Sequence, residues 1–212
     1  MLEFMSDNYL LTNNKALELY GYTKELPIFD YHCHLSPREI FEDKTFYNLT
    51  ELWLISDHYK WRIMRAYGID ESYITGNAGA KEKFFKFAEA LPSFIGNPVY
   101  HWAHLELKQY LGLTLPICAK NAEQIWSLTL SKMKDGSFSA RKLIGSSNVK
   151  YIVTTDDPID SLIYHQKLKK EGLSFMVLPC FRPDAAINIE KPAFTDYIKQ
   201  LGLASGIVIK DF

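Results

Sequence analysis

The chain has 212 residues, of which 47% are hydrophobic and 23% are charged, and its formal net charge is -1. This composition is that of a soluble globular protein, long enough to bury a sizeable core in one domain or in two small ones. The near-neutral charge, without any basic stripe, argues against nucleic-acid and membrane-surface partners, and no apolar run reaches the length of a membrane helix.

The N-terminal residues and the cysteines both indicate the compartment in which the protein would be found. The N-terminal residues are acidic and lack the apolar stretch of a signal peptide. The three cysteines, Cys33, Cys118 and Cys180, are an odd number without C-x-x-C spacing. We therefore expect reduced thiols and a cytoplasmic protein.

The first two thirds of the chain are predicted to be mostly helical. A short helix is expected over 10–20 and a first strand over 26–34, and the pattern is then helical from 37 to about 148. Pro92 and the Gly-Asn-Pro stretch at 96–98 divide this region into separate helices. The predicted helices cover 48–55, 58–66, 81–91, 99–111 and 122–134.

Strands and helices then alternate. A clear strand over 149–155 precedes a helix over 159–170, for which Asp157 would be the N-cap and Pro158 the first residue. A further strand, a helix and a weak strand are predicted. They cover 173–180, 193–201 and 206–210.

This alternation predicts an α/β fold with a parallel sheet and right-handed crossovers. We divide the chain into 1–36, with the first strand, the helical insertion 37–148, and the strands and helices of 149–212. A closed eight-stranded barrel needs about 250 residues even without a large insertion. The pattern therefore fits a small open α/β domain or the first part of a barrel, and the stop at Phe212 favours the second.

His32 and His34 are the strongest candidates for a metal site. Residues two apart on a strand point to the same face, so these two imidazoles would lie side by side while Tyr31 and Cys33 face the other way. Paired imidazoles at a strand end suit a divalent metal such as zinc. A chance pair is the alternative, and Cys33 is expected to be a buried apolar residue.

Two further candidates follow helix or strand boundaries. His58 and Tyr59 would lie in the first turn of a helix capped by Ser56 or Asp57, where free N–H groups favour an anionic substrate. The alternative is an ordinary capped helix with Tyr59 and Trp61 buried. Arg182 directly follows a strand and could hold a carboxylate through two parallel hydrogen bonds; the alternative is a surface pair with Asp184.

The remaining polar residues have weaker signals. Asp156 or Thr155 could line a pocket, although capping explains the neighbouring Asp157. His101 and His104 share a helix face and could form a second metal site, but packing and local hydrogen bonds are the favoured explanation. His165 lies in a polar helix and is expected to be solvated.

Five segments in the same order resemble the uronate isomerases, also called glucuronate isomerases, of the amidohydrolase superfamily. Together they run through nearly the whole chain. They are PIFDYHCHL (27–35), SDHYKWRIMR (56–65), FIGNPVYHWAHLEL (94–107), TTDDPIDSL (154–162) and LPCFRPDAAINIE (178–190).

The resemblance implies a metal-dependent-hydrolase-type (β/α)₈ barrel with a helical insertion after its first strand. It implies reversible isomerisation of D-glucuronate to D-fructuronate and of D-galacturonate to D-tagaturonate, with a divalent metal, zinc in our expectation. The metal-binding pair would be His32 and His34. His58 and Tyr59 would contact the hexuronate, and Arg182 would bind its carboxylate.

The resemblance also implies what is missing from this chain. Family members continue beyond this point and bring a further His, a strand-end Asp that acts as metal ligand and base, and an Arg and a Trp. We therefore expect an N-terminal portion with a half-built site, inactive alone, whose open sheet favours association into a homo-oligomer. A metal-dependent hydrolase of the same superfamily and a non-catalytic binding or dimerisation piece remain the alternatives.

Overall fold

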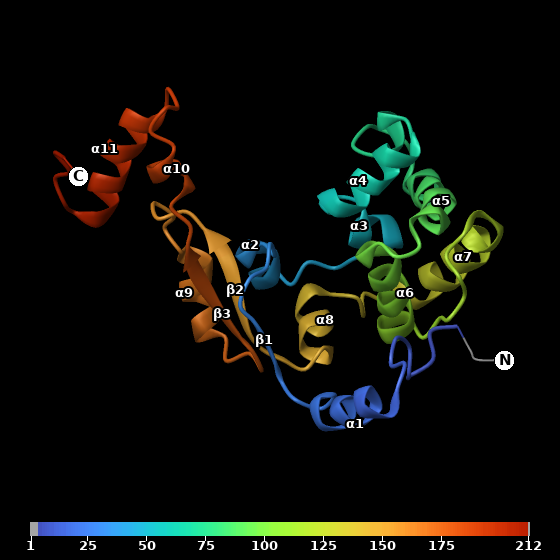
Figure 1. Ribbon diagram of the computed structural model, residues 1–212. Coiled ribbons are helices and arrows are strands. Elements are labelled where there is room, and N and C mark those ends of the chain that lie inside the picture. Colours follow the sequence, from blue (N-terminus) through green and yellow to red (C-terminus); the bar gives the residue numbers. More distant parts are fainter. Residues whose placement is uncertain (1–3, 212) are drawn as a thin grey trace. The chain divides into compact units, whose positions relative to one another are not determined.

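The computed structural model describes residues 4–211, which divide between two compact units. The helical unit comprises Met1–Lys24 and Thr45–Leu143, and the sheet unit comprises Glu25–Lys44 and Ile144–Phe212. Figure 1 labels their helices and strands. The chain thus passes three times between the units, so the early helix belongs with the helical insertion, and the segment just after the first strand belongs with the sheet.

The helical unit is built from short and medium helices. Their bounds lie within a few residues of the predicted ones for 48–55, 58–66, 81–91, 99–111 and 122–134. The helices are α1 (Asn14–Thr23), α3 (Leu49–Trp53), α4 (His58–Tyr67), α5 (Ala80–Ala90), α6 (Pro98–Leu111) and α7 (Ala122–Met133), with 3₁₀ turns η1 (Glu71–Tyr73), η2 (Leu91–Phe94) and η3 (Ala119–Asn121).

Local sequence sets where these helices begin and end. The side chains of Asn48, Asp57 and Asn97 accept hydrogen bonds from backbone N–H groups in the first turns of α3, α4 and α6. This satisfies donors that a helix start otherwise leaves unpaired. Gly68 and Gly112 end α4 and α6 with positive φ angles of 93° and 62°, a conformation that glycine adopts without a Cβ penalty.

Large aromatic side chains fill the core of the helical unit. Trp53 of α3 lies 6.5 Å from Phe84 and 6.1 Å from Phe87 of α5, measured between ring centroids. Trp126 of α7 lies 5.6 Å from Phe84 in the same way. All four are buried, so α5 is the central helix against which α3 and α7 pack.

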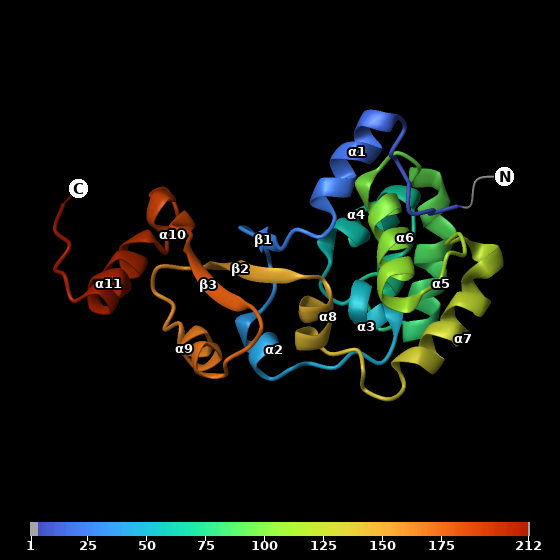
Figure 2. The ribbon, with the colours of Figure 1, turned by 90° about the horizontal axis from the view of Figure 1, so that it is seen from below.

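The sheet unit has three parallel strands in the order β1 (Ile28–Asp30), β2 (Val149–Asp156) and β3 (Met176–Phe181). Figure 2 shows β2 and β3 running together. Helices α2 (Pro37–Phe41) and α9 (Ile163–Lys170) pack on the sheet through a small core. That core consists of Ile40, Ile144, Ile152, Leu168, Phe175 and Val177.

The other helices of this part are α8 (Ala140–Ser146), within which the chain passes between the units, α10 (Asp184–Ile187) and α11 (Phe194–Ser205). The α/β class and the parallel sheet confirm the coarse prediction. Among residues 4–211, none of the helices has both the length and the apolar character needed to cross a bilayer.

The predicted start of the helix over 159–170 is wrong. Helix α9 begins at Ile163, and Asp157 instead closes a turn by accepting a hydrogen bond from the Ile159 N–H at 3.0 Å. The Asp160 N–H donates to the Asp157 carbonyl oxygen at 2.9 Å. Asp-Pro suits a turn as well as a helix start, and here the Asp157 carboxylate is also held by the hydroxyl of Tyr197 at 2.8 Å.

Two predicted strands also differ from the structure. The first strand is regular only over Ile28–Asp30, not over the whole of 26–34. The segment 206–210 is not a strand, because Gly206 ends α11 with a φ of 70° and the Ile207 N–H donates back to the Gly202 carbonyl at 3.1 Å. The start of this segment therefore serves to terminate the helix.

Candidate active site

The two predicted metal-binding histidines lie close together just beyond β1. Beyond Asp30 the chain bends at His32 but stays beside β2, since the Cys33 N–H donates to the Val153 carbonyl oxygen at 2.9 Å. The backbone N–H of His32 donates to the Asp30 carboxylate at 3.3 Å. The Nε2 atoms of His32 and His34 are 3.2 Å apart. The predicted side-by-side arrangement of the two imidazoles is therefore confirmed.

This spacing fits two ligands of one metal ion. A tetrahedral zinc with bonds of 2.0–2.1 Å holds two nitrogen ligands about 3.3–3.4 Å apart. Within residues 4–211 there is no group of three or more His, Cys, Asp or Glu side chains that could hold a metal. The described part of the chain therefore supplies the pair His32 and His34 as candidate ligands.

Cys33, between the two histidines, belongs to the core and not to the imidazole pair. It is half-buried and packs against the sheet unit's hydrophobic core. Burial, together with the nearby carboxylates of Asp30 and Asp156, raises the pKa of the Cys33 thiol. A thiol that stays protonated is a poor metal ligand and a poor nucleophile, as the sequence predicted for this residue.

A buried polar cluster lies at the carboxyl end of β2. The Thr154 hydroxyl donates to Asp156 Oδ2 at 2.7 Å and lies 2.8 Å from His165 Nε2 of α9. Because the hydroxyl proton is directed to the carboxylate, the imidazole is the donor in the second bond. His165 is only 8% exposed, so the expectation that it is solvated is wrong.

Asp156 ties the ends of β2 and β3 together. Its Oδ2 accepts a hydrogen bond from the Cys180 N–H at 3.3 Å, and its backbone carbonyl accepts one from the Arg182 N–H at 3.0 Å. Asp156 lines a pocket of about 290 Å³, as the sequence suggested. His165 and the residues at the start of α2 line the same pocket. The carboxylate of Asp156 thus holds Cys180, and its backbone carbonyl holds Arg182 where the chain leaves the sheet.

Arg182 lies directly after β3, and its guanidinium is half-exposed. Its Nε donates to Asp184 Oδ2 at 2.6 Å, which is the surface pair that the sequence offered as the alternative. At this exposure such a pair contributes about 0–1 kcal/mol, little enough for a stronger bidentate partner to displace. The pair therefore leaves Arg182 available as a carboxylate ligand.

His58 and Tyr59 form an exposed aromatic pair at the start of α4. Their ring centroids are 4.3 Å apart, with an angle of 32° between the ring planes. Asp57 caps the helix as predicted, accepting from the N–H groups of Tyr59 and Lys60 at 2.9 and 3.2 Å. Half of the Tyr59 side chain is exposed, so the burial of Tyr59 that the alternative expected is wrong.

His101 and His104 do not form a second metal site. His104 is buried, and its Nδ1 lies 2.7 Å from the Tyr100 carbonyl oxygen while its Nε2 accepts from the Ile117 N–H at 2.8 Å. His101 Nδ1 pairs with the Tyr9 hydroxyl at 2.7 Å. Both imidazoles are thus used in packing and hydrogen bonding, which was the favoured explanation.

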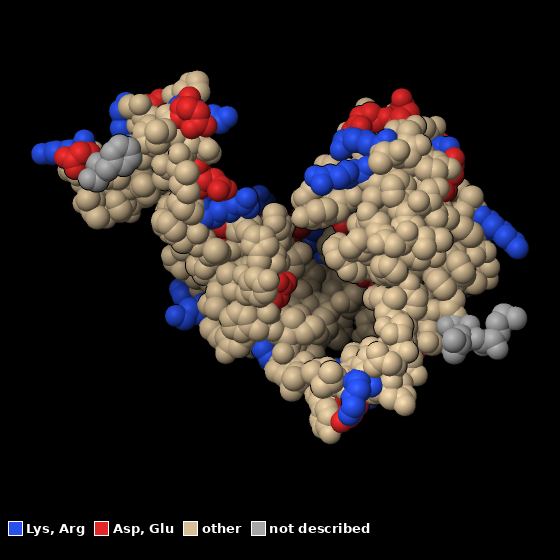
Figure 3. Space-filling view, in the orientation of Figure 1, with Lys and Arg blue, Asp and Glu red and all other residues tan. Residues whose placement is uncertain are grey.

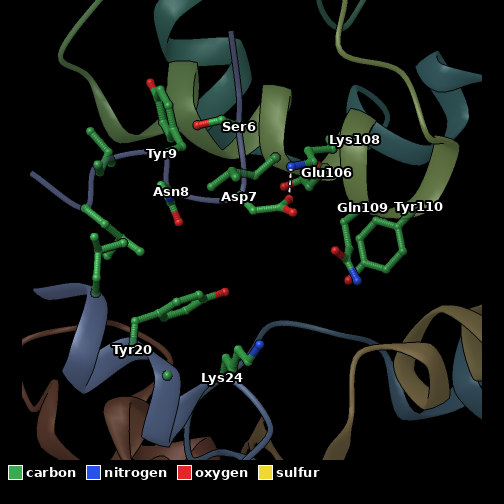
Figure 4. A pocket seen from close by; sticks show the side chains of 15 residues that line it. Ser6, Asp7, Asn8, Tyr9, Tyr20, Lys24, Glu106, Lys108, Gln109 and Tyr110 are labelled. Atoms are coloured by element: carbon green, nitrogen blue, oxygen red, sulfur yellow. Dashed lines mark hydrogen bonds and ion pairs between the residues drawn. The ribbon is translucent and has the colours of Figure 1, made fainter. Parts of the chain in front are cut away.

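A larger hollow of about 700 Å³ lies on the helical unit between the N-terminal segment, α1 and α6. Figure 4 shows Asp7 paired with Lys108, and Tyr20 and Lys24 opposite them. None of the predicted site residues lines it, and its two carboxylates, Asp7 and Glu106, offset its two lysines. This hollow therefore has no net charge with which to attract an anionic substrate.

Surface charge is likewise mixed. On the face shown in Figure 3, basic and acidic side chains are interspersed on both units. This agrees with the formal net charge of -1. This face therefore offers no general positive field that would attract an anion.

The sequence did not reveal that the polar side chains of Lys60 and His165 are buried. Lys60, at the start of α4, is 5% exposed, and its Nζ lies 2.8 Å from Asp57 Oδ2. The spacing of three residues between Asp57 and Lys60 was a usable signal for the pair, but not for its burial. The role of His165 depends on Thr154, eleven residues away, and no local pattern announces it.

Known proteins that are similar to this chain in sequence are uronate or glucuronate isomerases. A family model described as glucuronate isomerase matches residues 1–212. The uronate isomerases of Caldanaerobacter subterraneus subsp. tengcongensis and Bacillus subtilis are 53% and 50% identical to it, each over 214 residues. These matches cover 100% of this chain but only 46% and 45% of those proteins, so the chain spans less than half of their length.

Two solved structures that resemble this chain are also uronate or glucuronate isomerases. The crystal structure of a uronate isomerase from Thermotoga maritima superposes with a TM-score of 0.90 at 37% identity, covering 96% of this chain and 45% of that one. The glucuronate isomerase from Caulobacter crescentus superposes with a TM-score of 0.80 at 26% identity, covering 89% of this chain and 41% of that one.

Proposed function

The chain belongs to the glucuronate isomerase family, and from that premise we propose that the whole protein interconverts aldose and ketose forms of hexuronates. The substrates would be D-glucuronate and D-galacturonate, and the products D-fructuronate and D-tagaturonate. The observation that carries the proposal is the match to this family along all of residues 1–212.

The reaction moves a proton and needs no external oxidant. The C2 proton is removed and a proton is returned to C1 through a cis-enediol, while the proton of the O2 hydroxyl is lost and O1 gains one, so that the aldehyde becomes a hydroxymethyl group and the C2 hydroxyl becomes a ketone. Such a path needs groups that hold the sugar chain in place and groups that stabilise the enediolate oxygens.

His32 and His34 are the proposed metal-binding residues. Their Nε2 separation of 3.2 Å supports the assignment because it suits two ligands of one tetrahedral ion. When bound, a divalent metal, zinc in this proposal, would supply Lewis-acid polarisation of the substrate carbonyl. The further ligands and the proton-transferring base would come from parts of the whole protein outside residues 1–212.

Arg182, His58 and Tyr59 are the proposed substrate contacts. Arg182 would exchange its exposed partner Asp184 for the C6 carboxylate, which anchors the end of the substrate away from C1 and C2. The Tyr59 hydroxyl would donate to a substrate oxygen or relay a proton, and His58 would bind hydroxyl groups or assist ring opening. Their exposure at the start of α4 supports these roles.

The remaining parts of the proposal concern the whole protein. We infer that β1, β2 and β3 are the first strands of a (β/α)₈ barrel, which their parallel order supports. The isolated chain would then lack activity, because the carboxylate that we expect to act as base belongs to the last strand of the barrel, outside residues 1–212. We further propose a cytoplasmic protein that assembles into homo-oligomers.

Activity is testable in a completed polypeptide, in which residues 1–212 are joined to the part of the Caldanaerobacter uronate isomerase beyond the matched segment. With metal supplied, incubation with D-glucuronate or D-galacturonate should yield the corresponding ketose, detected by chromatography. The Caldanaerobacter enzyme itself is the control. The proposal fails if the control forms ketose and the folded completed polypeptide forms none, or if it instead cleaves members of an ester and amide panel.

A further inference from the structure

Lys60 is a buried cation that the proposed chemistry does not use. It lies in the first turn of α4, next in sequence to the exposed pair His58 and Tyr59, but only 6% of its side chain is accessible. Its ammonium group lies 5.7 Å from the ring centroid of Trp53 in α3. Burying a lysine is costly unless its charge is paired, so its partners show what holds it there.

Two carboxylates pair with Lys60. The first is Asp57 Oδ2 at 2.8 Å, and the second is Glu106 Oε2 of α6 at 3.8 Å. Burial opposes ionisation of Asp57, but the charge and hydrogen bonds of Lys60 outweigh it and lower the pKa of Asp57. Burial raises the pKa of Glu106, against the attraction of Lys60. Asp57 is therefore the principal partner.

Asp57 has two functions at once. Its Oδ1 accepts the N–H groups of Tyr59 and Lys60, which fixes the first turn of α4, and its Oδ2 binds the ammonium group. The link from Lys60 to Glu106 then ties this turn to α6, whose Glu106 also lines the hollow in Figure 4. The orientation of the His58–Tyr59 pair thus depends on a buried ion pair behind it.

We propose that Lys60 is a positioning residue, whose ammonium group, held between Asp57 and Glu106, fixes the first turn of α4 and with it His58 and Tyr59. It does not touch the substrate itself. Its contribution to isomerisation rests on the proposed function, but its structural effect on the His58–Tyr59 pair does not. The two can be tested separately.

The structural effect is measured on the 212-residue chain by NMR of the His58 ring protons. At a centroid distance of 4.3 Å the Tyr59 ring shifts these signals, and a Tyr59→Leu variant gives their unshifted positions. Lys60→Met should move them toward that reference. The control Lys86→Met removes a lysine from an exposed pair with Glu89, which has the same three-residue spacing and a 2.8 Å distance, and should leave them in place.

A second variant provides a test if Lys60→Met does not fold. Asp57→Asn keeps a good N-cap but removes the charge that pairs with Lys60, and it should move the His58 signals in the same direction. If Lys60→Met does not fold, the His58 signals of Asp57→Asn alone test whether the ion pair positions His58 and Tyr59. Unchanged His58 signals in the folded Lys60→Met protein, or in Asp57→Asn where that variant decides, would overturn the proposal.

The catalytic consequence is measured in the completed polypeptide. Lys60→Met should lower kcat/KM for D-glucuronate by about 10- to 100-fold per folded molecule, the loss typical of misplaced contact groups. In a Tyr59→Phe background the same change should have a smaller effect, since both act on one contact. The positioning role of Lys60 is contradicted if Lys60→Met lowers kcat/KM as much in the Tyr59→Phe background as in the parent. It is also contradicted if Lys60→Met does not lower kcat/KM in the parent. No ketose from the parent polypeptide refutes only the proposed function.

Discussion

Acid should destabilise the helical unit through His104. This imidazole is 2% exposed and uses both nitrogens, with Nδ1 donating to the Tyr100 carbonyl and Nε2 accepting from the Ile117 N–H. Protonation of Nε2 removes that acceptor. Burial accordingly lowers the pKa of His104 below its ordinary value of 6.5. The hydrogen bond to Tyr100 raises the pKa, but by less than burial lowers it.

The sign of the pH effect follows from proton binding. Between the lowered folded pKa and about 6.5, the unfolded chain binds more protons at His104 than the folded chain does. The stability contributed by the neutral imidazole is therefore complete above about pH 6.5 and is lost as the pH falls toward the folded pKa. A buried N–H left without a partner costs about 1–3 kcal/mol, which sets the scale of the loss.

A His104→Leu variant tests this reasoning. It should unfold about 2–12 °C below the parent at pH 7.5, because it leaves the Ile117 N–H unpaired at all pH values. Its stability should also change less between pH 7.5 and 5, measured by circular dichroism during heating. His101→Leu, which removes a less buried imidazole, should keep the parent's pH dependence. Equal pH slopes in the parent and in His104→Leu would refute the argument.

Three further predictions concern the sheet unit. In the completed polypeptide, Arg182→Lys should raise KM for D-glucuronate about tenfold with a smaller change in kcat, because one of two parallel hydrogen bonds to the carboxylate is lost; equal kinetics would count against the assignment. His34→Ala should lower the zinc content measured by atomic emission, whereas His101→Ala should not, and equal zinc in both would exclude the pair as ligands. Asp156→Asn should accelerate hydrogen exchange at the Cys180 amide, because an amide oxygen is a weaker acceptor than a carboxylate; unchanged exchange would show that the bond does not secure the strand end.

Local patterns in the sequence were enough to predict most elements. The helix over 58–66 was placed nearly correctly because Asp57 is a strong N-cap and its effect stays within one turn. The closeness of His32 and His34 was also predictable, since extended backbone puts residues two apart on the same side. Such features need no knowledge of distant contacts.

Features that depend on distant partners were missed. Asp157-Pro158 could start either a helix or a turn, and the Tyr197 hydroxyl, forty residues away, holds the turn. His165 looked solvated in its polar helix, but Thr154 on β2 buries and pairs it. The burial of Lys60 depends on contacts with Trp53 of α3 and Glu106 of α6, which its neighbours in the sequence do not indicate. Burial of a polar side chain is a tertiary property, so sequence spacing alone does not predict it.

The assignment to hexuronate isomerisation is tested most directly by following one carbon atom. D-Glucuronate labelled with ¹³C at C1 is incubated with the completed polypeptide and observed by NMR. We expect the label's anomeric signal to be replaced by that of a hydroxymethyl carbon, because C1 of the aldose becomes C1 of the ketose. A label that keeps its anomeric signal, while the Caldanaerobacter control converts it, would contradict the account.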